Sequence, residues 1–440
     1  MCKRMKRTLP ILICLALLLA ACAQSAPLET PAPAAGTTAP TPFPTPASTP
    51  EPTPEPSPEP TPEPAAEALA FTAESTAGIA ARLCDGAYQR DELFPAGTTI
   101  TLRAEEKIGS LYVIFGSYPG EWTLTAGGES RTCGTDGYLH EYVRLDLPSE
   151  TVELTLPERV VIAEITAYTP GRPPEDVQIW TRADEGVDIL IFSSHADDEL
   201  LFMGGMIPYY AAVRGLSVQV VYMTTNYDAA NRSPYLLNYR FRPHEALNGL
   251  WTVGDRIYPI TNAARDRSCE NVWEAERIFG KDQFAEFQTE MIRRFKPLVV
   301  VTHAENGEYG HGAHVLTARS VERAVEAAAD PAQFPESAAA YGVWDTPKTY
   351  LHEYGGDETI TVLNYEEPAD ALGGLTPFEA AQEGYRRHLT QQQWDIFKVY
   401  GFGDLHDSHR FGLYRSLVGP DTERNDLMEN VSREMFPLPG

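Results

Sequence analysis

A short polar stretch near the middle of the chain constrains its fold more than any other feature. One imidazole and three carboxylates fall within five residues, His195-Ala196-Asp197-Asp198-Glu199. They follow residues 187–192, a mostly apolar run rich in β-branched side chains that is typical of a buried parallel strand. Open α/β sheets bind ligands at the carboxyl ends of their strands, and buried charged groups remain charged only when they are paired or bound to a metal. The stretch therefore predicts an α/β fold with a charged site at a strand end.

A second polar stretch, residues 303–314, follows another apolar run at residues 297–302. Within it, His311 and His314 lie three residues apart at the start of a helix-like pattern that continues to residue 329, so both imidazoles can face one point. Two imidazoles and a carboxylate form a donor set for a divalent metal. The second stretch therefore predicts a metal site beside a second strand end.

Strand-like and helix-like runs alternate from about residue 184 onward. Residues 218–224 give another strand pattern, residues 274–295 a helix that leads into the strand at 297–302, and residues 376–400 a further helix-like pattern. This alternation indicates an α/β domain with a Rossmann-like parallel sheet. No Gly-x-Gly-x-x-Gly follows the first strand, so the pattern does not indicate a dinucleotide site.

The two polar stretches resemble the signatures of one enzyme family. His195-Ala196-Asp197-Asp198-Glu199 resembles the His-Pro-Asp-Asp-Glu signature of the PIG-L/LmbE-like zinc N-deacetylases, and residues 307–314 are similar to their second signature, Gly-Glu-Tyr-Gly-His-x-x-His. Residues 242–246 resemble the Arg-x-x-Glu-Ala stretch between them, and residues 411–415 and 425–426 are similar to the C-terminal part of some bacterial members. The chain departs from the pattern at Ala196, where Pro is usual, and at Gly312-Ala313, where Pro-Asp is usual; neither position would contact a metal.

The resemblance implies a PIG-L/LmbE-like deacetylase domain over residues 183–440 with zinc, or another divalent metal, as its cofactor. His195, Asp198 and His314 would be three metal ligands, which leaves the fourth position of a catalytic zinc for water. Asp197, next to the ligands but not one of them, would be the general base as water attacks an acetamide carbonyl.

Three further side chains complete the expected site, and each has an alternative. His311 would protonate the leaving amine or stabilise the charged intermediate. Tyr309 would donate to the oxyanion, or it could simply pack. Arg242 would bind a hydroxyl or phosphate of the substrate, or it could pair with Glu245. Other polar residues near these stretches are expected to be structural: Glu199, His244, His303 and His352.

The first 22 residues are expected to be a targeting segment. A basic start precedes an apolar stretch that is too short to span a bilayer, and Leu19-Ala20-Ala21-Cys22 resembles a bacterial lipobox. The resemblance implies a bacterial lipoprotein, held outside the cytoplasm on a membrane through lipid at Cys22; the alternative is an ordinary secretory signal. Residues 23–66 are rich in Pro, Thr and Glu, which predicts a disordered, extended linker.

Residues 67–182 carry short strand-like runs between turn residues, for example at 99–102, 111–115 and 160–168. Many short strands at this spacing predict an all-β sandwich. The end of the region, up to Trp180, resembles galactose-binding-like modules, which implies either a sugar-binding role or a packing domain without a ligand.

Charge and motif together narrow the function classes. The formal net charge of −27 argues against nucleic acid as a partner and against docking on anionic lipid through a basic patch. The leading hypothesis is a metal-dependent hydrolase that removes the N-acetyl group from N-acetylglucosamine or a related amino-sugar glycan at the cell surface. The alternatives are a zinc hydrolase of another amide conjugate and a non-catalytic, glycan-binding surface lipoprotein.

Overall fold

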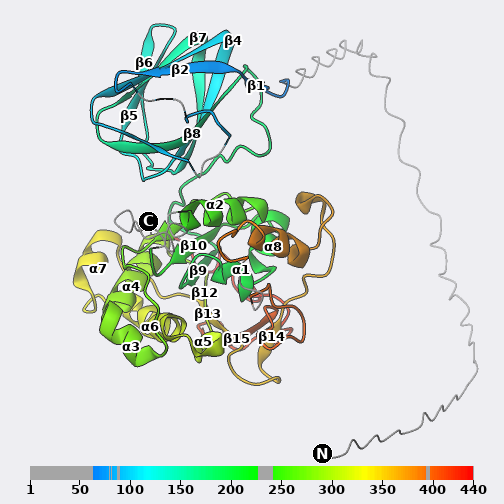
Figure 1. Cartoon of the computed structure of the whole chain (residues 1–440). Coiled ribbons are helices and arrows are strands. Elements are labelled where there is room, and N and C mark those ends of the chain that lie inside the picture. Colours follow the sequence, from blue (N-terminus) through cyan, green and yellow to red (C-terminus); the bar gives the residue numbers. More distant parts are fainter. Residues whose placement is uncertain are drawn as a thin grey trace, which may run out of the picture. The chain divides into compact units, whose positions relative to one another are not determined.

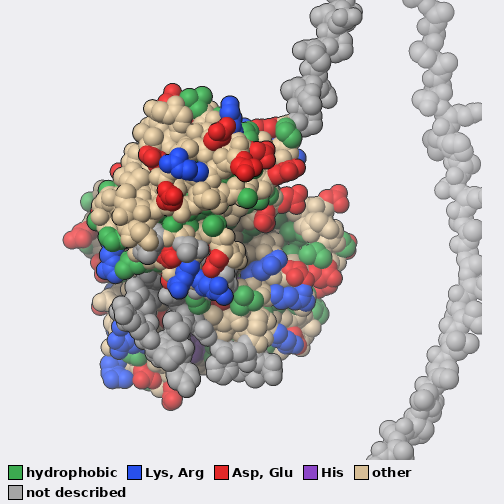
Figure 2. All heavy atoms as spheres, turned by 45° about the horizontal axis from the view of Figure 1, so that its top comes forward, with side chains coloured by type: hydrophobic (Ala, Val, Ile, Leu, Met, Phe, Trp, Pro, Cys, Tyr) green, Lys and Arg blue, Asp and Glu red, His purple; other side chains and the backbone are tan. Residues whose placement is uncertain are grey.

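The structure is a computed structural model, and it describes residues 63–439 apart from residues 79, 81, 87–89, 226–240 and 393–396 (Figure 1). The expected targeting segment (residues 1–22), the lipid anchor at Cys22 and nearly all of the expected linker (residues 23–66) lie outside the described residues. Among the residues described, every helix is too short or too polar to cross a membrane. Acidic and basic side chains are intermixed on the face drawn in Figure 2.

The first part of the described chain is all β. Its strands form one antiparallel sheet in the order β1-β8-β4-β7-β5-β6, with β2 paired to β4 and β3 paired to β8. The strands are β1 (Ala68–Leu69), β2 (Phe71–Ser75), β3 (Glu92–Phe94), β4 (Thr98–Phe115), β5 (Trp122–Ala126), β6 (Glu129–Cys133), β7 (His140–Leu156) and β8 (Val160–Tyr168).

The long strand β4 organises this sheet, since it pairs with β7, β8 and β2. The prediction of separate strands at residues 99–102 and 111–115 is wrong, because β4 runs through both. The polar residues between them lie where the β4–β7 register shifts, and such irregularities bend a strand without ending it. Side chains from both halves of β4, such as Ile100 and Val113, are buried in the same apolar cluster.

The second part of the chain forms a sheet in the order β11-β10-β9-β12-β13-β15-β14. The five strands from β11 to β13 are parallel, as the sequence predicts, whereas β15 pairs antiparallel with both β13 and β14. The strands are β9 (Ile189–Ser193), β10 (Val218–Tyr222), β11 (Ile260–Thr261), β12 (Val299–Thr302), β13 (Lys348–His352), β14 (Ile360–Val362) and β15 (Arg410–Ser416). The helices are α1 (Asp198–Leu201), η1 (Pro208–Val213), α2 (Arg242–Thr252), α3 (Val272–Phe279), α4 (Gln283–Phe295), α5 (Gly307–Gly310), α6 (Gly312–Ala329), α7 (Pro335–Tyr341), η3 (Asp370–Leu372) and α8 (Pro377–Tyr385).

Helices cover both faces of this sheet, and the side chains of β9 show how the layers are built (Figure 1). Leu190 and Phe192 belong to the apolar cluster that includes side chains of α3, α4 and α6. Ile189 and Ile191 belong to the cluster that includes side chains of α1, α2 and α8. The strand is therefore buried on both sides, which explains its nearly continuous apolar sequence.

Two predicted helices are shorter than expected. The helix predicted over residues 274–295 is divided into α3 and α4 at Gly280, whose φ of 83° ends the first helix. Within the described residues of the helix-like pattern at 376–400, the α-helix is α8, which begins with a capping box at Thr376. After α8 the chain turns, and the backbone N–H and hydroxyl of Thr390 both donate to Glu245 of α2.

Candidate active site

The two polar stretches meet at the carboxyl edge of the parallel sheet. β9 and β12 are adjacent parallel strands, and Thr302 pairs with Phe192 in their ladder. The chain leaves both strands at the same edge, with α1 following β9 and α6 following β12. The topology thus brings together residues that are more than 100 positions apart in sequence.

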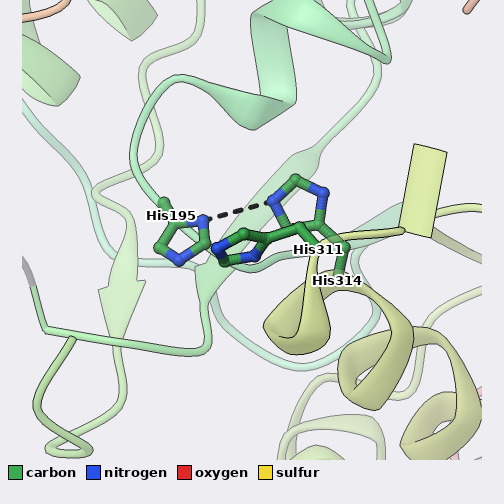
Figure 3. Close-up of side chains that lie close together, drawn as sticks. All are labelled: His195, His311 and His314. Carbon is green, nitrogen blue, oxygen red and sulfur yellow. Dashed lines mark hydrogen bonds between the residues drawn. The ribbon is translucent and has the colours of Figure 1, made fainter. Parts of the chain in front are cut away.

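The three predicted metal ligands converge on one another. Oδ2 of Asp198 lies 2.9 Å from Nδ1 of His195 and 3.1 Å from Nε2 of His314, and the two imidazole nitrogens are 3.3 Å apart. Figure 3 shows the two imidazoles directed at each other from different elements. Donor atoms on a tetrahedral zinc with bonds of about 2.0–2.1 Å lie about 3.3 Å apart, so these three residues fit zinc.

The carboxylates around the two imidazoles make the cluster attract positive charge. Burial alone lowers the pKa of His195, but Asp266 and Asp198 raise it to about 10. Burial likewise lowers the pKa of His314, and Asp198 outweighs that effect and raises it to about 9. The same electrostatic field favours a divalent cation, which replaces the protons of its ligands when it binds.

His303 is close to this cluster but does not offer a lone pair to it. Donor atoms of Asp198, His303 and His314 lie within 4.8 Å of one another. However, Nε2 of His303 accepts the N–H of Ser194 at 3.0 Å, and its Nδ1 lies 3.1 Å from a carboxylate oxygen of Glu308. Both nitrogens are therefore engaged, so the set with His195 is the better metal site.

Asp197, the predicted general base, is buried and paired with one cation. Nη2 of Arg242 donates to Oδ1 of Asp197 at 2.8 Å, and the backbone N–H of Asp197 donates to Glu199 at 2.9 Å. Burial raises the pKa of Asp197, Arg242 offsets part of that effect, and the result is a pKa of about 7, near the value that suits a base at neutral pH. The residue has a φ of 125°, a strained conformation that costs about 1–3 kcal/mol and is typical of functional sites.

His311 is directed at the same point as the two ligand imidazoles (Figure 3). Its ring centroid lies 5.0 Å from that of His195 and 4.7 Å from that of His314. Burial, reinforced by the two neighbouring imidazoles, lowers the pKa of His311 to about 3. His311 is therefore a neutral imidazole here, able to donate one N–H to a substrate or to offer its lone pair to a metal.

Tyr309 stands at the edge of the site and is 49% exposed, so it is not a core residue. Its ring centroid lies 5.4 Å from that of His314 and 6.2 Å from that of Phe202. Burial of the hydroxyl and the charge of Asp198 raise the pKa of Tyr309, so the hydroxyl keeps its proton and remains a donor.

Arg242 opens α2, and its guanidinium also donates to the backbone carbonyl of Ala196 beside the base. Glu245, the other partner considered for Arg242, accepts instead from Thr390. The geometry thus makes Arg242 a partner of the loop that holds Asp197, and its predicted contact with substrate stays a prediction.

Two carboxylates behind the ligands are absent from the sequence prediction. Oδ1 of Asp266 lies 3.4 Å from Nε2 of His195, and Oε2 of Glu308 lies 2.9 Å from Nδ1 of His314. Each carboxylate faces the ring nitrogen of a predicted ligand imidazole that points away from the metal position. Glu308 lies inside the second signature, which is a usable signal, whereas Asp266 follows a two-residue strand and carries none.

Comparisons with known proteins identify the region that holds this site. Residues 190–325 match the model of the PIG-L family, described as GlcNAc-PI de-N-acetylase. A 1D-myo-inositol 2-acetamido-2-deoxy-alpha-D-glucopyranoside deacetylase from Catenulispora acidiphila is 31% identical over 183 residues, which are 37% of this chain and 54% of the relative. A protein of the same name from Geodermatophilus obscurus is 28% identical over 223 residues, which are 44% of this chain and 74% of the relative.

Among solved structures, the N,N'-diacetylchitobiose deacetylase from Pyrococcus horikoshii aligns with a TM-score of 0.35 at 18% identity, covering 46% of this chain and 70% of that one. The chain spans about half the length of the Catenulispora relative. All seven predicted site residues lie within the matched residues 190–325.

Proposed function

We propose that this chain is a zinc-dependent N-deacetylase that hydrolyses the acetamide of N-acetylglucosamine or a related amino-sugar glycan. The observation that carries the proposal is the convergence of His195, Asp198 and His314 to within 3.3 Å of one another beside Asp197. The amino-sugar substrate is supported by the PIG-L match and by the names of the relatives, which act on a 2-acetamido-2-deoxy-glucopyranoside.

The residues of the chain supply the proton transfers and the charge stabilisation that amide hydrolysis needs. Zinc, when bound, provides the Lewis acidity that activates water and the acetamide carbonyl near neutral pH. Asp197 takes one proton from the attacking water, since its pKa of about 7 allows it to accept and later release that proton. The C–N bond then breaks, the proton on Asp197 passes to the amine nitrogen, and acetate and a free amino sugar are released.

His311 and Tyr309 stabilise the charge that develops during this step. The hydroxyl of Tyr309 donates to the carbonyl oxygen as that oxygen becomes negative. Because His311 is neutral, its N–H is suited to stabilising the charged intermediate, the second of its two predicted roles. The amine proton then comes from Asp197.

We extend the proposal to the location of the enzyme and to its first domain. The basic and apolar start of the chain and the lipobox-like Leu19-Ala20-Ala21-Cys22 support a bacterial lipoprotein that acts outside the cytoplasm on a surface glycan. The antiparallel strands between residues 68 and 168 support an all-β module, and a galactose-binding-like sandwich that holds glycan near the active site is our proposal for it.

Acetate release by the chain from Ala23 to Gly440 tests this function. The substrates are N-acetylglucosamine, its oligomers, cell-wall fragments, an N-acetylglucosaminyl glycolipid and amide conjugates of other amines, each with zinc and then with EDTA. We expect EDTA-sensitive release from at least one amino-sugar substrate. Release only from other amides would support the alternative hydrolase, and no release from any substrate by zinc-loaded protein would contradict the deacetylase.

A further inference from the structure

Glu308 is a buried carboxylate at the edge of the metal site, and none of the steps above uses it. Its side chain has no exposed surface. Its backbone has a φ of 56° and a ψ of −85°, a conformation that side-chain-bearing residues seldom adopt, and Gly307 and Gly310 on either side also have positive φ. A strained residue of this kind persists only when the surrounding contacts hold it, and such residues cluster at functional sites.

Four N–H groups hold the carboxylate of Glu308. Oε1 accepts from the backbone N–H of Ala304 at 3.0 Å and faces Nδ1 of His352 at 3.2 Å. Oε2 faces Nδ1 of His303 at 3.1 Å and Nδ1 of His314 at 2.9 Å. Because an ionised carboxylate can only accept hydrogen bonds, each of the three Nδ1 atoms must carry a hydrogen.

The three imidazoles differ in what their second nitrogen, Nε2, contacts. Nε2 of His303 accepts the N–H of Ser194, so His303 is neutral. Nε2 of His314 faces Asp198 and His195, so the tautomer with hydrogen on Nδ1 aims its lone pair at the metal position. Nε2 of His352 lies 3.1 Å from the backbone carbonyl oxygen of Asp407, which can only accept, so His352 carries hydrogen on both nitrogens and its positive charge balances Glu308.

We propose that Glu308 is a positioning residue that fixes the Nδ1–H tautomer and the ring orientation of His314, while His303 and His352 hold the carboxylate in place. The inference rests on the proposed function in one respect, the assignment of His314 as a zinc ligand. The ring of His303 also stacks on that of His314, with centroids 4.2 Å apart and an interplanar angle of 23°. The ligand on α6 is thus tied to the ends of β12 and β13, not to its own loop alone.

Zinc affinity of the full mature chain tests this role. Glu308→Gln keeps the size of the side chain but replaces one acceptor oxygen by an NH2 group, which repels an imidazole N–H. We expect the zinc dissociation constant, measured by competition with a chromogenic chelator, to rise about 10- to 100-fold. At saturating zinc, kcat for acetate release falls while KM changes little, since Glu308 does not contact the substrate. The matched control is Glu305→Gln, an exposed carboxylate of the same turn, which leaves zinc affinity at the wild-type value.

Histidine nitrogen NMR of the unmutated, 15N-labelled protein tests the same role without a substitution, and it decides the matter if Glu308→Gln does not fold. We expect hydrogen on Nδ1 alone for His303 and for zinc-loaded His314, and hydrogen on both nitrogens for His352 at pH 7. Hydrogen on Nε2 of His314 in place of Nδ1, or an unchanged zinc affinity in folded Glu308→Gln, would overturn the inference. Neither readout needs turnover, so a protein that binds zinc but releases no acetate would contradict the proposed function and leave this inference standing.

Discussion

Asp197 and Glu308 are two buried carboxylates at the same sheet edge, and the structure gives them opposite properties. Each lies a few residues after the end of a parallel strand, and each has a strained backbone with positive φ. Burial raises the pKa of both groups. At Asp197, Arg242 offsets only part of that effect and the pKa is about 7, whereas at Glu308 the surrounding imidazoles, His303 first, outweigh burial and hold the pKa well below its usual value.

The difference shows that burial alone does not determine whether a carboxylate can serve as a general base. A general base must change its protonation state during each turnover, so it needs a pKa near the working pH and few fixed donors. A positioning residue must not change its protonation state, and four N–H donors ensure that Glu308 does not. Two titratable groups whose environments move their pKa values apart are a reliable guide to such a division of roles.

The largest expected effect concerns the base. Asp197→Asn keeps the size of the side chain and an oxygen for Arg242 but cannot accept a proton, so we expect kcat for deacetylation to fall by about 10²- to 10⁴-fold. Zinc content, measured by atomic emission, should stay at the wild-type level, because Asp197 is not among the converging ligand atoms. Asp198→Asn is the contrasting variant and should lose both zinc and activity. A kcat within tenfold of wild type in Asp197→Asn would show that another group accepts the proton.

A smaller effect is expected on stability, from the cation that balances Glu308. His352→Leu leaves the buried carboxylate without its positive partner, and breaking a buried pair in this way costs about 3–5 kcal/mol of unfolding free energy. Urea unfolding in the presence of EDTA measures the loss without a contribution from zinc. The double variant with Glu308→Gln removes both charges and should recover part of that loss. If the two substitutions were additive, Glu308 and His352 would not act as a pair.

The positions of the proposed ligands and of the proposed base could be predicted from sequence, because these residues follow strands directly. The apolar run at residues 187–192 indicates a strand, and a strand end fixes where His195, Asp197 and Asp198 lie. The same reasoning places His311 and His314 beside β12. The two polar stretches meet because β9 and β12 are adjacent in the sheet. The strand patterns in the sequence are compatible with this adjacency, and the family resemblance implies it.

The role of Glu308 could not be predicted in the same way, because its partners come from separate elements. His303 follows β12, His314 lies in α6 and His352 ends β13, so their meeting depends on the order of strands in the sheet. Local patterns carry no information on that order. The sequence could indicate that His303 and His352 are structural. It could not indicate that both contact Glu308, because that depends on the order of strands.

The smallest expected effect tests whether a single cation, Arg242, sets the pKa of Asp197. Arg242 lowers the pKa of Asp197, so Arg242→Gln should raise it, by about one unit for a single opposite charge at this distance. A base acts in its deprotonated form; a higher pKa therefore moves the acid limb of the kcat/KM profile to higher pH, and the rate below pH 7 falls.

Arg242→Lys is the matched control, since it keeps the charge and should keep the limb near its wild-type position. Profiles of kcat/KM and of kcat from pH 5 to 9, at saturating zinc, separate this electrostatic effect from the predicted contact of Arg242 with substrate. Loss of that contact would raise KM at every pH without moving the acid limb. An acid limb at the same pH in wild type and Arg242→Gln would mean that Arg242 does not set the pKa of Asp197. The contrast between one cation at Asp197 and four N–H donors at Glu308 would then lose its mechanistic meaning.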